Sequence, residues 1–282
     1  MKICMGLTLF YPTLSELDSI LKYSQVFERI YVFDNTDNKE EQEFNDNHLI
    51  NIENIVYISE TNNYGLSISL NRMCKKAIFD NFDFICLFDQ DSNMNNGDLI
   101  KINNYIENSV SSDIGIYAAR VVYGERQKEI NLNNKLSELE VEWAITSGSY
   151  INLHIYSATN GFDENYFIDR LDYDYCFQLK KLNFKIVEFK NVFLYQQLGE
   201  KGRFLWFKIS EHNTLRHYYI FRNRLYFYLN KYFSIKNIFI VFILSVNHFM
   251  IILIEKDSVK KAKIIKKSIN DYLKNKMGKY EI

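Results

Sequence analysis

Residues 84–91 read Phe84-Ile85-Cys86-Leu87-Phe88-Asp89-Gln90-Asp91, an apolar run that stops at two carboxylates. Five apolar residues in a row predict a strand that is buried on both faces, as in a parallel sheet. In open α/β sheets, ligands bind beyond the carboxyl ends of the strands. Asp89 and Asp91 are therefore a candidate site for Mg²⁺ or Mn²⁺, which prefer oxygen ligands. The alternative for an isolated Asp-x-Asp is an acidic turn.

Strand and helix patterns alternate on both sides of this run, which is typical of βαβ units. The sequence therefore predicts an α/β protein with a Rossmann-like, mostly parallel central sheet. The further strands are expected at Met1–Leu9, Arg29–Phe33, Ile55–Ile58 and Ile114–Ala118. No P-loop or G-x-G-x-x-G motif is present, which argues against those two nucleotide sites.

The composition is that of a folded, intracellular protein. Hydrophobic residues make up 47% of the 282 residues and aromatic residues 16%, so a disordered chain is excluded. The four cysteines are far apart and three lie in apolar runs, which predicts buried thiols in a reducing compartment. The N-terminus lacks the pattern of a signal peptide, and we expect a cytoplasmic protein.

Charge divides the chain in two. Residues 1–200 carry a formal charge of −13 and residues 201–282 carry +12. Strand patterns stop near residue 200, and helical patterns follow near 214–231, 235–254 and 258–275. We therefore predict a catalytic or binding domain over 1–200, with halves of about 1–110 and 111–200, and a basic helical region over 201–282. An apolar helix beside a lysine-rich one favours contact with an anionic membrane surface, and the alternative is a helical tail packed on the acidic domain.

Polar residues follow several predicted strands at the same edge of the sheet. Thr8 ends the first strand, and Asp34 and Asn35 follow the second. The segment from Asn63 through Gly65 to Asn71 opens a helix, where backbone N–H groups can meet phosphates or hydroxyls. A turn at Asp34 and a simple helix cap at Asn63 are the alternatives.

A second acidic block places five acidic residues between positions 163 and 174, among aromatic residues. Asp172 can begin a helix, where the helix dipole favours a negative charge. A carboxylate held beside an acceptor hydroxyl can instead act as a general base.

Taken together, these motifs resemble a family-two inverting glycosyltransferase of GT-A fold, of the bacterial rhamnosyltransferase-like branch. No single motif is decisive, but their order and spacing are. They are Phe33-Asp34-Asn35, Asn63-x-Gly65 with Asn71, Phe88-Asp89-Gln90-Asp91-Ser92, Thr146-Ser147-Gly148-Ser149, Gly161-Phe162-Asp163-Glu164, Phe167-Ile168-Asp169-x-x-Asp172-x-Asp174, and Arg216-x-Tyr218-Tyr219-x-x-Arg222-Asn223.

The resemblance assigns roles to residues of this chain. It implies that Asp172 is the catalytic base, with Asp169 as second choice, and that Asp89 and Asp91 bind metal and diphosphate. It implies an acceptor side shaped by Asp163 and Glu164, and diphosphate contacts or structural ion pairs for Arg216 and Arg222. The implied donor-binding residues are Thr8, Asp34, Asn35, Asn63, Gly65, Asn71, Asp89, Ser147 and Gly148.

The implied reaction moves a sugar, with L-rhamnose from dTDP-rhamnose as the first expectation, to a saccharide on a polyprenyl-type lipid carrier. Such enzymes build capsule, O-antigen or cell-wall polysaccharide, and a peripheral place at the inner membrane face follows. A UDP-sugar donor is the alternative within this fold. A metal-dependent nucleotidyltransferase and an inactive membrane-surface scaffold are the rivals outside it.

One departure from the resemblance concerns the metal. Many relatives have a histidine where this chain has Gln197. An amide is a poorer ligand for transition metals than imidazole, which favours Mg²⁺ over Mn²⁺ or weak binding. His212 or His217 could supply the missing ligand instead.

Overall fold

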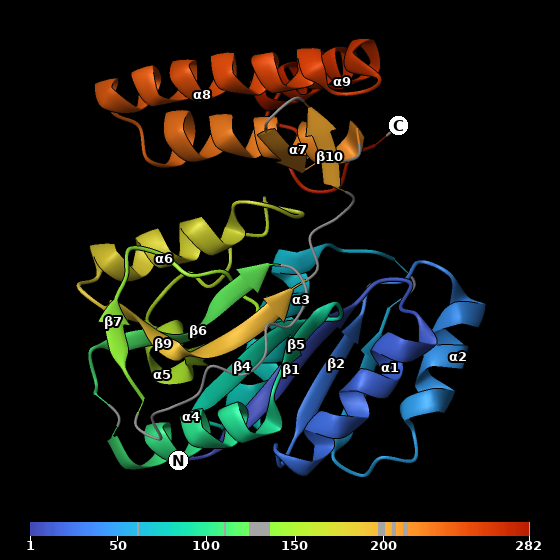
Figure 1. Ribbon diagram of the computed structural model, residues 1–282, viewed down its shortest axis with the longest axis vertical. Coiled ribbons are helices and arrows are strands. Elements are labelled where there is room, and N and C mark those ends of the chain that lie inside the picture. Colours follow the sequence, from blue (N-terminus) through green and yellow to red (C-terminus); the bar gives the residue numbers. More distant parts are fainter. Residues whose placement is uncertain are drawn as a thin grey trace.

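The computed structural model describes residues 1–60, 62–109, 111–123, 136–196, 201–204, 207–210 and 214–281. In these ranges nine strands form one sheet in the order β3-β2-β1-β4-β8-β6-β9-β5, and β7 also pairs with β9 (Figure 1). The strands are β1 (Ile3–Leu9), β2 (Ile30–Asp34), β3 (Ile55–Ser59), β4 (Phe84–Asp89), β5 (Ser92–Met94), β6 (Ile114–Tyr123), β7 (Glu138–Glu140), β8 (Ser149–Asn152) and β9 (Lys185–Gln196).

The sheet confirms the predicted α/β class and is mostly parallel. Strands β1 to β4 pair in parallel, as do β6 and β9. β8 lies between β4 and β6 and runs antiparallel to both, and β5 and β7 run antiparallel to β9. The reversed strand in the middle of the sheet was not predicted, because its four residues are too few to show a pattern.

Helices cover both faces of the sheet. Apolar side chains of α1, α2 and α4 share one buried cluster with one face, and those of α3, α5 and α6 share a second cluster with the other (Figure 1). These helices are α1 (Leu14–Leu21), α2 (Lys39–Leu49), α3 (Leu66–Phe79), α4 (Asn96–Ser109), α5 (Leu153–Ser157) and α6 (Leu171–Lys181), with a 3₁₀ turn η1 (Lys22–Gln25) after α1.

The C-terminal region is helical, as predicted. Figure 1 shows α8 and α9 at the end of the molecule farthest from the sheet, with α7 beneath them. Phe221 and Leu225 of α7 pack with Val241 and Ile252 of α8 and with Ile265 of α9. The elements are α7 (Thr214–Leu225), the π-helical turn η2 (Tyr226–Lys231), α8 (Ile235–Ile254) and α9 (Ser258–Leu273).

One prediction for this region was wrong. A two-stranded antiparallel hairpin, β10 (Lys201–Phe204) and β11 (Phe207–Ser210), lies beyond residue 200, where no strand was expected. Its strands have four residues each, so the alternation by which strands are recognised in a sequence has no length in which to develop.

Candidate active site

The carboxyl ends of three neighbouring strands meet at one edge of the sheet. Thr8 of β1 pairs in register with Asp89 of β4, and Leu9 pairs with Asp34 of β2. A cavity of about 960 Å³ opens at this edge. It is lined by the sheet edge, the start of α3, the start of α6 and one face of α7. The lining includes Thr8, Asn35, Asn63, Gly65, Asp89, Asp91, Asp169, Arg170, Asp172, Tyr173, Gln196, Arg216 and Tyr219.

Asp89 and Asp91 both line this cavity, on the turn between β4 and β5. The turn is held by Ser147, whose hydroxyl accepts a hydrogen bond from the Asp89 backbone at 3.1 Å and donates to the Ser92 hydroxyl at 2.7 Å. Gln196 of β9 lies opposite, with its side-chain nitrogen 3.5 Å from an Asp89 carboxylate oxygen. Ser147 therefore holds the backbone of Asp89, and Gln196 of β9 contacts its carboxylate.

The electrostatics of this edge favour a bound cation. Desolvation, together with the charges of Asp91 and Asp172, raises the pKa of Asp89 to about 7. Desolvation by the cavity walls also raises the pKa of Asp91, against the lowering effect of a hydrogen bond from Gln196. Like charges held close together disfavour ionisation unless a cation compensates them.

The donor groups at this edge suit a hard metal ion. Within the described parts of the chain, no group of three or more His, Cys, Asp or Glu side chains could hold a metal. Mg²⁺ is, however, commonly bound through one or two carboxylates together with substrate phosphates and water. Asp89 and Asp91, with the Gln196 amide beside them, fit that pattern.

Of the two histidines expected as possible metal ligands, His217 alone lies within the described residues. Gln197 and His212 lie outside the described residues. His217 is buried and faces α8, with Nδ1 2.9 Å from His248 Nε2 and Nε2 3.0 Å from Glu255. The hypothesis that His217 supplies a metal ligand is therefore wrong, because its ring is turned into the helical region.

Asp172 stands in the first turn of α6 and lines the same cavity as Asp89 and Asp91. Desolvation raises its pKa to about 6, against the lowering effect of the Tyr173 backbone N–H, which donates to the carboxylate at 2.9 Å. A pKa in this range suits a general base at neutral pH, since the group is ionised and still basic.

The turn before α6 directs Asp172 into the cavity. Asp169 and Arg170 have left-handed backbone angles, with φ of 63° and 72°, a conformation that is uncommon for residues with side chains. Asn223 of α7 holds this turn by donating to the carbonyls of Ile168 at 2.7 Å and Asp169 at 3.0 Å. The helical region thus fixes the backbone from which Asp172 projects.

Arg216 and Arg222 have different surroundings. Arg216 lines the cavity, and its guanidinium lies 3.6 Å from the Asp169 carboxylate. Arg222 is almost completely buried and donates to the backbone carbonyl of Gly278 at 2.7 Å and of Lys276 at 3.3 Å. Arg216 is therefore placed to meet an anionic ligand, whereas Arg222 anchors the C-terminal tail.

Asp34 does not line the cavity. It is fully buried, and its carboxylate accepts hydrogen bonds from the Thr36 backbone at 2.8 Å, Asn45 at 2.8 Å and Tyr57 at 2.6 Å. The expectation that Asp34 contacts a base or ribose is corrected, since its oxygens are occupied inside the protein. Its neighbour Asn35 lines the cavity.

The loop before α3 contributes Asn63 and Gly65 to the cavity wall. Gly65 has φ of 85°, and a Cβ at this position would lie 2.5 Å from the Phe167 carbonyl oxygen. Leu66 N–H donates to that same carbonyl at 2.7 Å. Only glycine allows the loop to approach the Phe167 segment this closely.

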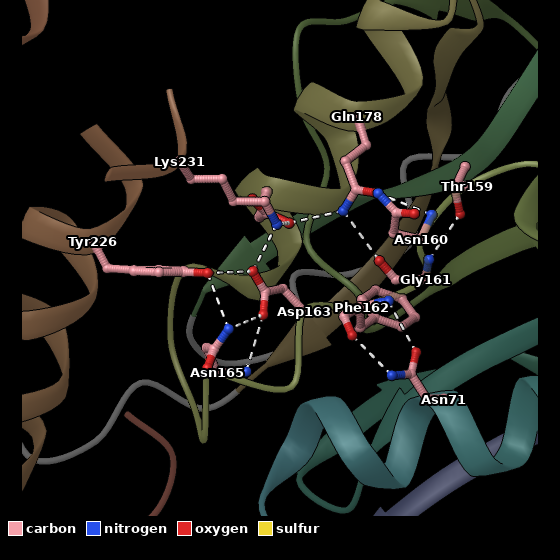
Figure 2. A network of polar contacts seen from close by, with 11 residues as sticks. Asn71, Thr159, Asn160, Gly161, Phe162, Asp163, Asn165, Gln178, Tyr226 and Lys231 are labelled. Atoms are coloured by element: carbon pink, nitrogen blue, oxygen red, sulfur yellow. Dashed lines mark hydrogen bonds and ion pairs between the residues drawn. The ribbon is translucent and has the colours of Figure 1, made fainter. Parts of the chain in front are cut away.

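Four predicted ligand-binding residues serve instead as internal connections. Asn71 donates to the Phe162 carbonyl at 2.8 Å and to Glu164 at 2.9 Å. Figure 2 shows Asp163 bridging to Tyr226 and Lys231 of η2, at 3.1 and 2.7 Å. The side chains of Asn71, Asp163 and Glu164 are thus hydrogen-bonded to other parts of the protein. They affect the cavity only by holding the surrounding backbone in place. The backbone N–H of Gly148 likewise donates a hydrogen bond to the carbonyl of Leu87 in β4, at 2.7 Å.

Several cavity residues were not assigned a role from the sequence. Arg170, Tyr173, Gln196 and Tyr219 line the cavity, but each belongs to a residue type that is common on any surface or in any core. Tyr219 stacks on Phe167, with ring centroids 5.2 Å apart. A contact between residues so far apart in the chain has no local pattern from which it could be predicted.

Comparisons with known proteins agree with this architecture. The sequence profile of Glycosyl transferase family 2 matches residues 14–167. A dTDP-rhamnosyl transferase, RfbF of Shigella flexneri, is 26% identical over 191 residues, which are 62% of this chain and 61% of the relative. The matched region therefore spans less than two thirds of that relative.

Two solved structures have the same fold at low sequence identity. Residues 1–349 of S. aureus TarS align over 97% of this chain and 72% of theirs, with a TM-score of 0.50 and 13% identity. GalNAc-T7, solved with UDP, GalNAc and Mn²⁺, aligns over 97% of this chain and 56% of its own, with a TM-score of 0.59 and 9% identity. A TarS complex with UDP-GlcNAc matches at a TM-score of 0.50.

Proposed function

The chain belongs to Glycosyl transferase family 2, and we propose that it is an inverting glycosyltransferase whose donor is dTDP-L-rhamnose. One observation carries the proposal. A single cavity contains the paired carboxylates Asp89 and Asp91 together with Asp172, a separate carboxylate with a raised pKa. A diphosphate-binding edge and a general base facing one cavity are the two requirements of a direct sugar transfer.

In the proposed reaction the acceptor hydroxyl attacks the anomeric carbon of the donor while Asp172 takes its proton. The new glycosidic bond forms as the bond to the nucleotide diphosphate breaks, and the configuration inverts. Asp169 is the second choice for the base, and its pairing with Arg216 favours a role in positioning. A Mg²⁺ or Mn²⁺ ion held by Asp89 and Asp91 would stabilise the charge of the leaving diphosphate.

The donor side of the cavity is formed by the strand ends and the loop before α3. Thr8 and Asn35 lie at the sheet edge, and Asn63 and Gly65 lie on that loop. Arg216 adds a positive charge that suits a diphosphate. The choice of dTDP-rhamnose rests on the similarity to the Shigella flexneri dTDP-rhamnosyl transferase. A UDP-sugar is the alternative, since TarS binds UDP-GlcNAc.

The acceptor is proposed to be a saccharide on a lipid carrier, in the synthesis of bacterial surface polysaccharide such as capsule or O-antigen. Among the described residues, one helix, Ile235–Leu253, is long and apolar enough to cross a membrane, and 17% of it is buried. One face of α8 exposes a row of large apolar residues, Ile235, Phe239, Phe242, Val246, Met250 and Leu253.

These features support peripheral attachment at the cytoplasmic face of the membrane. Lysines of α9, including Lys260, Lys263 and Lys266, are exposed next to α8. Anionic headgroups attract such lysines, at about 1 kcal/mol each near the surface, while apolar side chains enter the interface. The enzyme would then encounter a lipid-linked acceptor by diffusion along the membrane surface.

Binding of nucleotide sugars tests the proposed function. Melting temperature is measured with dTDP-L-rhamnose, UDP-GlcNAc, UDP-galactose and free dTDP, each with Mg²⁺ or Mn²⁺, because a ligand that binds only the folded state raises it. We expect the largest rise with dTDP-L-rhamnose and a metal. A larger rise with a UDP-sugar would transfer the proposal to that donor, and no rise with any nucleotide sugar would overturn it.

A further inference from the structure

Two exposed aromatic side chains stack on each other beside the cavity. The rings of Trp143 and Tyr173 have centroids 4.5 Å apart and planes inclined by 21°. Trp143 is 45% exposed and Tyr173 is 37% exposed, so the stacked rings together present an apolar surface to solvent. Tyr173 lines the cavity and follows Asp172 directly in the chain. The pair therefore extends the cavity wall outward from the proposed base.

Both rings are held by ordered backbone. Tyr173 stands in the first turn of α6. The segment that carries Trp143 is pinned on either side, because Val141 N–H donates to the Ile186 carbonyl at 2.9 Å and Ala144 N–H donates to the Cys176 sulfur at 3.4 Å. Little conformational freedom is left to lose when a ligand binds to such rings.

The groups around the pair select for a polar ligand that has one apolar face. The Arg170 guanidinium lies 5.0 Å from the centre of the Tyr173 ring, and Glu142 and Lys180 form an ion pair next to Trp143. A lipid surface or an apolar protein groove would leave these charges without water. A pyranose ring presents C–H groups on one face and hydroxyls at its rim, so it satisfies the aromatic rings and the charged groups together.

We propose that Trp143 and Tyr173 form a subsite for a pyranose ring of the acceptor, one ring away from the sugar whose hydroxyl reacts at Asp172. This inference rests on the proposed function and deepens it. Asp172 contacts the reacting hydroxyl, so the adjoining ring of a longer saccharide extends from that point toward Tyr173 and Trp143. The substrate class that follows is an acceptor with at least two linked sugars.

Fluorine NMR of protein labelled with 5-fluorotryptophan tests the subsite directly. The chain has two tryptophans, and the W143F variant identifies the Trp143 signal. The probes are methyl α-L-rhamnopyranoside, methyl β-D-glucopyranoside, methyl N-acetyl-β-D-glucosaminide and methyl β-maltoside. Sorbitol, which has the hydroxyls but no ring face, is the control. We expect a saturable shift of the Trp143 signal with at least one pyranoside, tightest for the disaccharide, and none with sorbitol.

Variants separate stacking from structure. Y173F keeps the ring and is expected to keep the shift, whereas Y173A is expected to weaken binding about tenfold or more, as truncation of a central aromatic contact does. F79A is the matched control, because Phe79 is 77% exposed and is not among the cavity-lining residues. If Y173A does not fold, the pyranoside titration of the protein without substitutions still tests the subsite.

Two results would overturn the subsite. One is a Trp143 fluorine signal that does not shift with any of the pyranosides up to about 50 mM. This limit corresponds to the millimolar end of the affinity scale. The other is a Trp143 signal that moves with protein concentration alone, with a doubled mass in light scattering, since a second copy of the chain would then cover the pair. Nucleotide-sugar binding is measured on the same samples. If it persists while Trp143 is silent, the subsite fails and the proposed function stands.

Discussion

The ammonium group of Lys231 lies 2.7 Å from the carboxylate of Asp174, whose side chain is completely buried. The same group also lies 2.7 Å from Asp163. Lys231 ends the π-helical turn of the C-terminal region, and Figure 2 shows it beside Asp163, which belongs to the loop before α6. Asp174 belongs to α6 itself. One cation thus joins the helical region to the element that carries Asp172.

Removing this cation is expected to destabilise the whole protein. Desolvation would raise the pKa of Asp163, but hydrogen bonding from Lys231 holds it below its ordinary value, while the pKa of Asp174 stays raised by desolvation. K231M removes the cation that pairs with both carboxylates and leaves them only neutral hydrogen-bond donors, so we expect the free energy of unfolding to fall by about 3–5 kcal/mol. Urea denaturation measures it, with K236M at an exposed lysine of α8 as the control. A loss below about 1 kcal/mol, as for a surface pair, would contradict the prediction.

Replacing Asp172 by Asn should stop catalysis without releasing the donor. The amide keeps the shape of the carboxylate and loses its basicity, so we expect turnover to fall about 10²–10⁴-fold, with donor-induced thermal shifts unchanged. D169N is the comparison, because Asp169 pairs with Arg216 at the same cavity. If D169N loses more turnover than D172N, Asp169 takes over the role of base.

The pH dependence of the reaction follows from the same residue. The pKa of Asp172 is raised to about 6 by desolvation, and a base acts only when it is ionised. kcat/KM should therefore be level above pH 7 and fall as pH falls through about 6, approaching a tenfold loss for each further unit. A level profile down to pH 5 would exclude Asp172 as the base. The profile is measured with saturating metal.

Metal ions should stabilise the protein through Asp89 and Asp91. Binding to the folded state raises the melting temperature, and we expect Mg²⁺ or Mn²⁺ with dTDP to raise it more than dTDP alone. D91N is expected to abolish the metal-dependent part of that rise, since Asp91 lines the cavity as an exposed ligand group. Chelation with EDTA should reverse the effect in the unmodified protein. An equal rise with and without metal would show that the donor binds independently of it.

Attachment to membranes should depend on the exposed face of α8. Phe239 and Phe242 are 66% and 67% exposed, so F239E/F242E is expected to fold normally. Burial of each side chain in the interface is worth about 1.5–3 kcal/mol, and we expect binding to vesicles of phosphatidylglycerol and phosphatidylethanolamine to weaken more than about tenfold. F79E, at an exposed position on α3, is the control. Equal sedimentation of both variants with vesicles would argue against attachment through α8.

Gly65 is expected to tolerate no side chain. A Cβ there would lie 2.5 Å from the Phe167 carbonyl oxygen, and the backbone has φ of 85°. G65A should lower the free energy of unfolding by about 1–3 kcal/mol and reduce donor binding by moving the loop. G278A separates the two causes, because Gly278 has φ of 76° with no atom within 4 Å of an added Cβ. A loss in G65A no larger than in G278A would assign the effect to backbone strain alone.

The sheet and the residues at its carboxyl edge could be predicted because their signals are local. Apolar runs such as Phe84–Phe88 predict buried strands, and polar residues directly after them predict the side chains at the strand ends. Thr8, Asp89 and Asp91 were found in this way, and all three line the cavity. The same reasoning placed Asp34 in the cavity, but its carboxylate is buried. Asn45 and Tyr57, which belong to other elements, donate hydrogen bonds to it.

The amino-acid sequence alone determined the alternation of strands and helices, the carboxylates at the sheet edge and the division between an acidic body and a basic helical end. The tertiary structure decided which of five neighbouring acidic residues line the cavity, namely Asp169 and Asp172, since the local pattern of Asp163, Asp172 and Asp174 is alike. Lys231 pairs with Asp163 and Asp174 inside the protein, and Asn223 holds the left-handed turn that directs Asp172 into the cavity. Both partners come from a part of the chain more than fifty residues away, and no local pattern can encode so distant a contact.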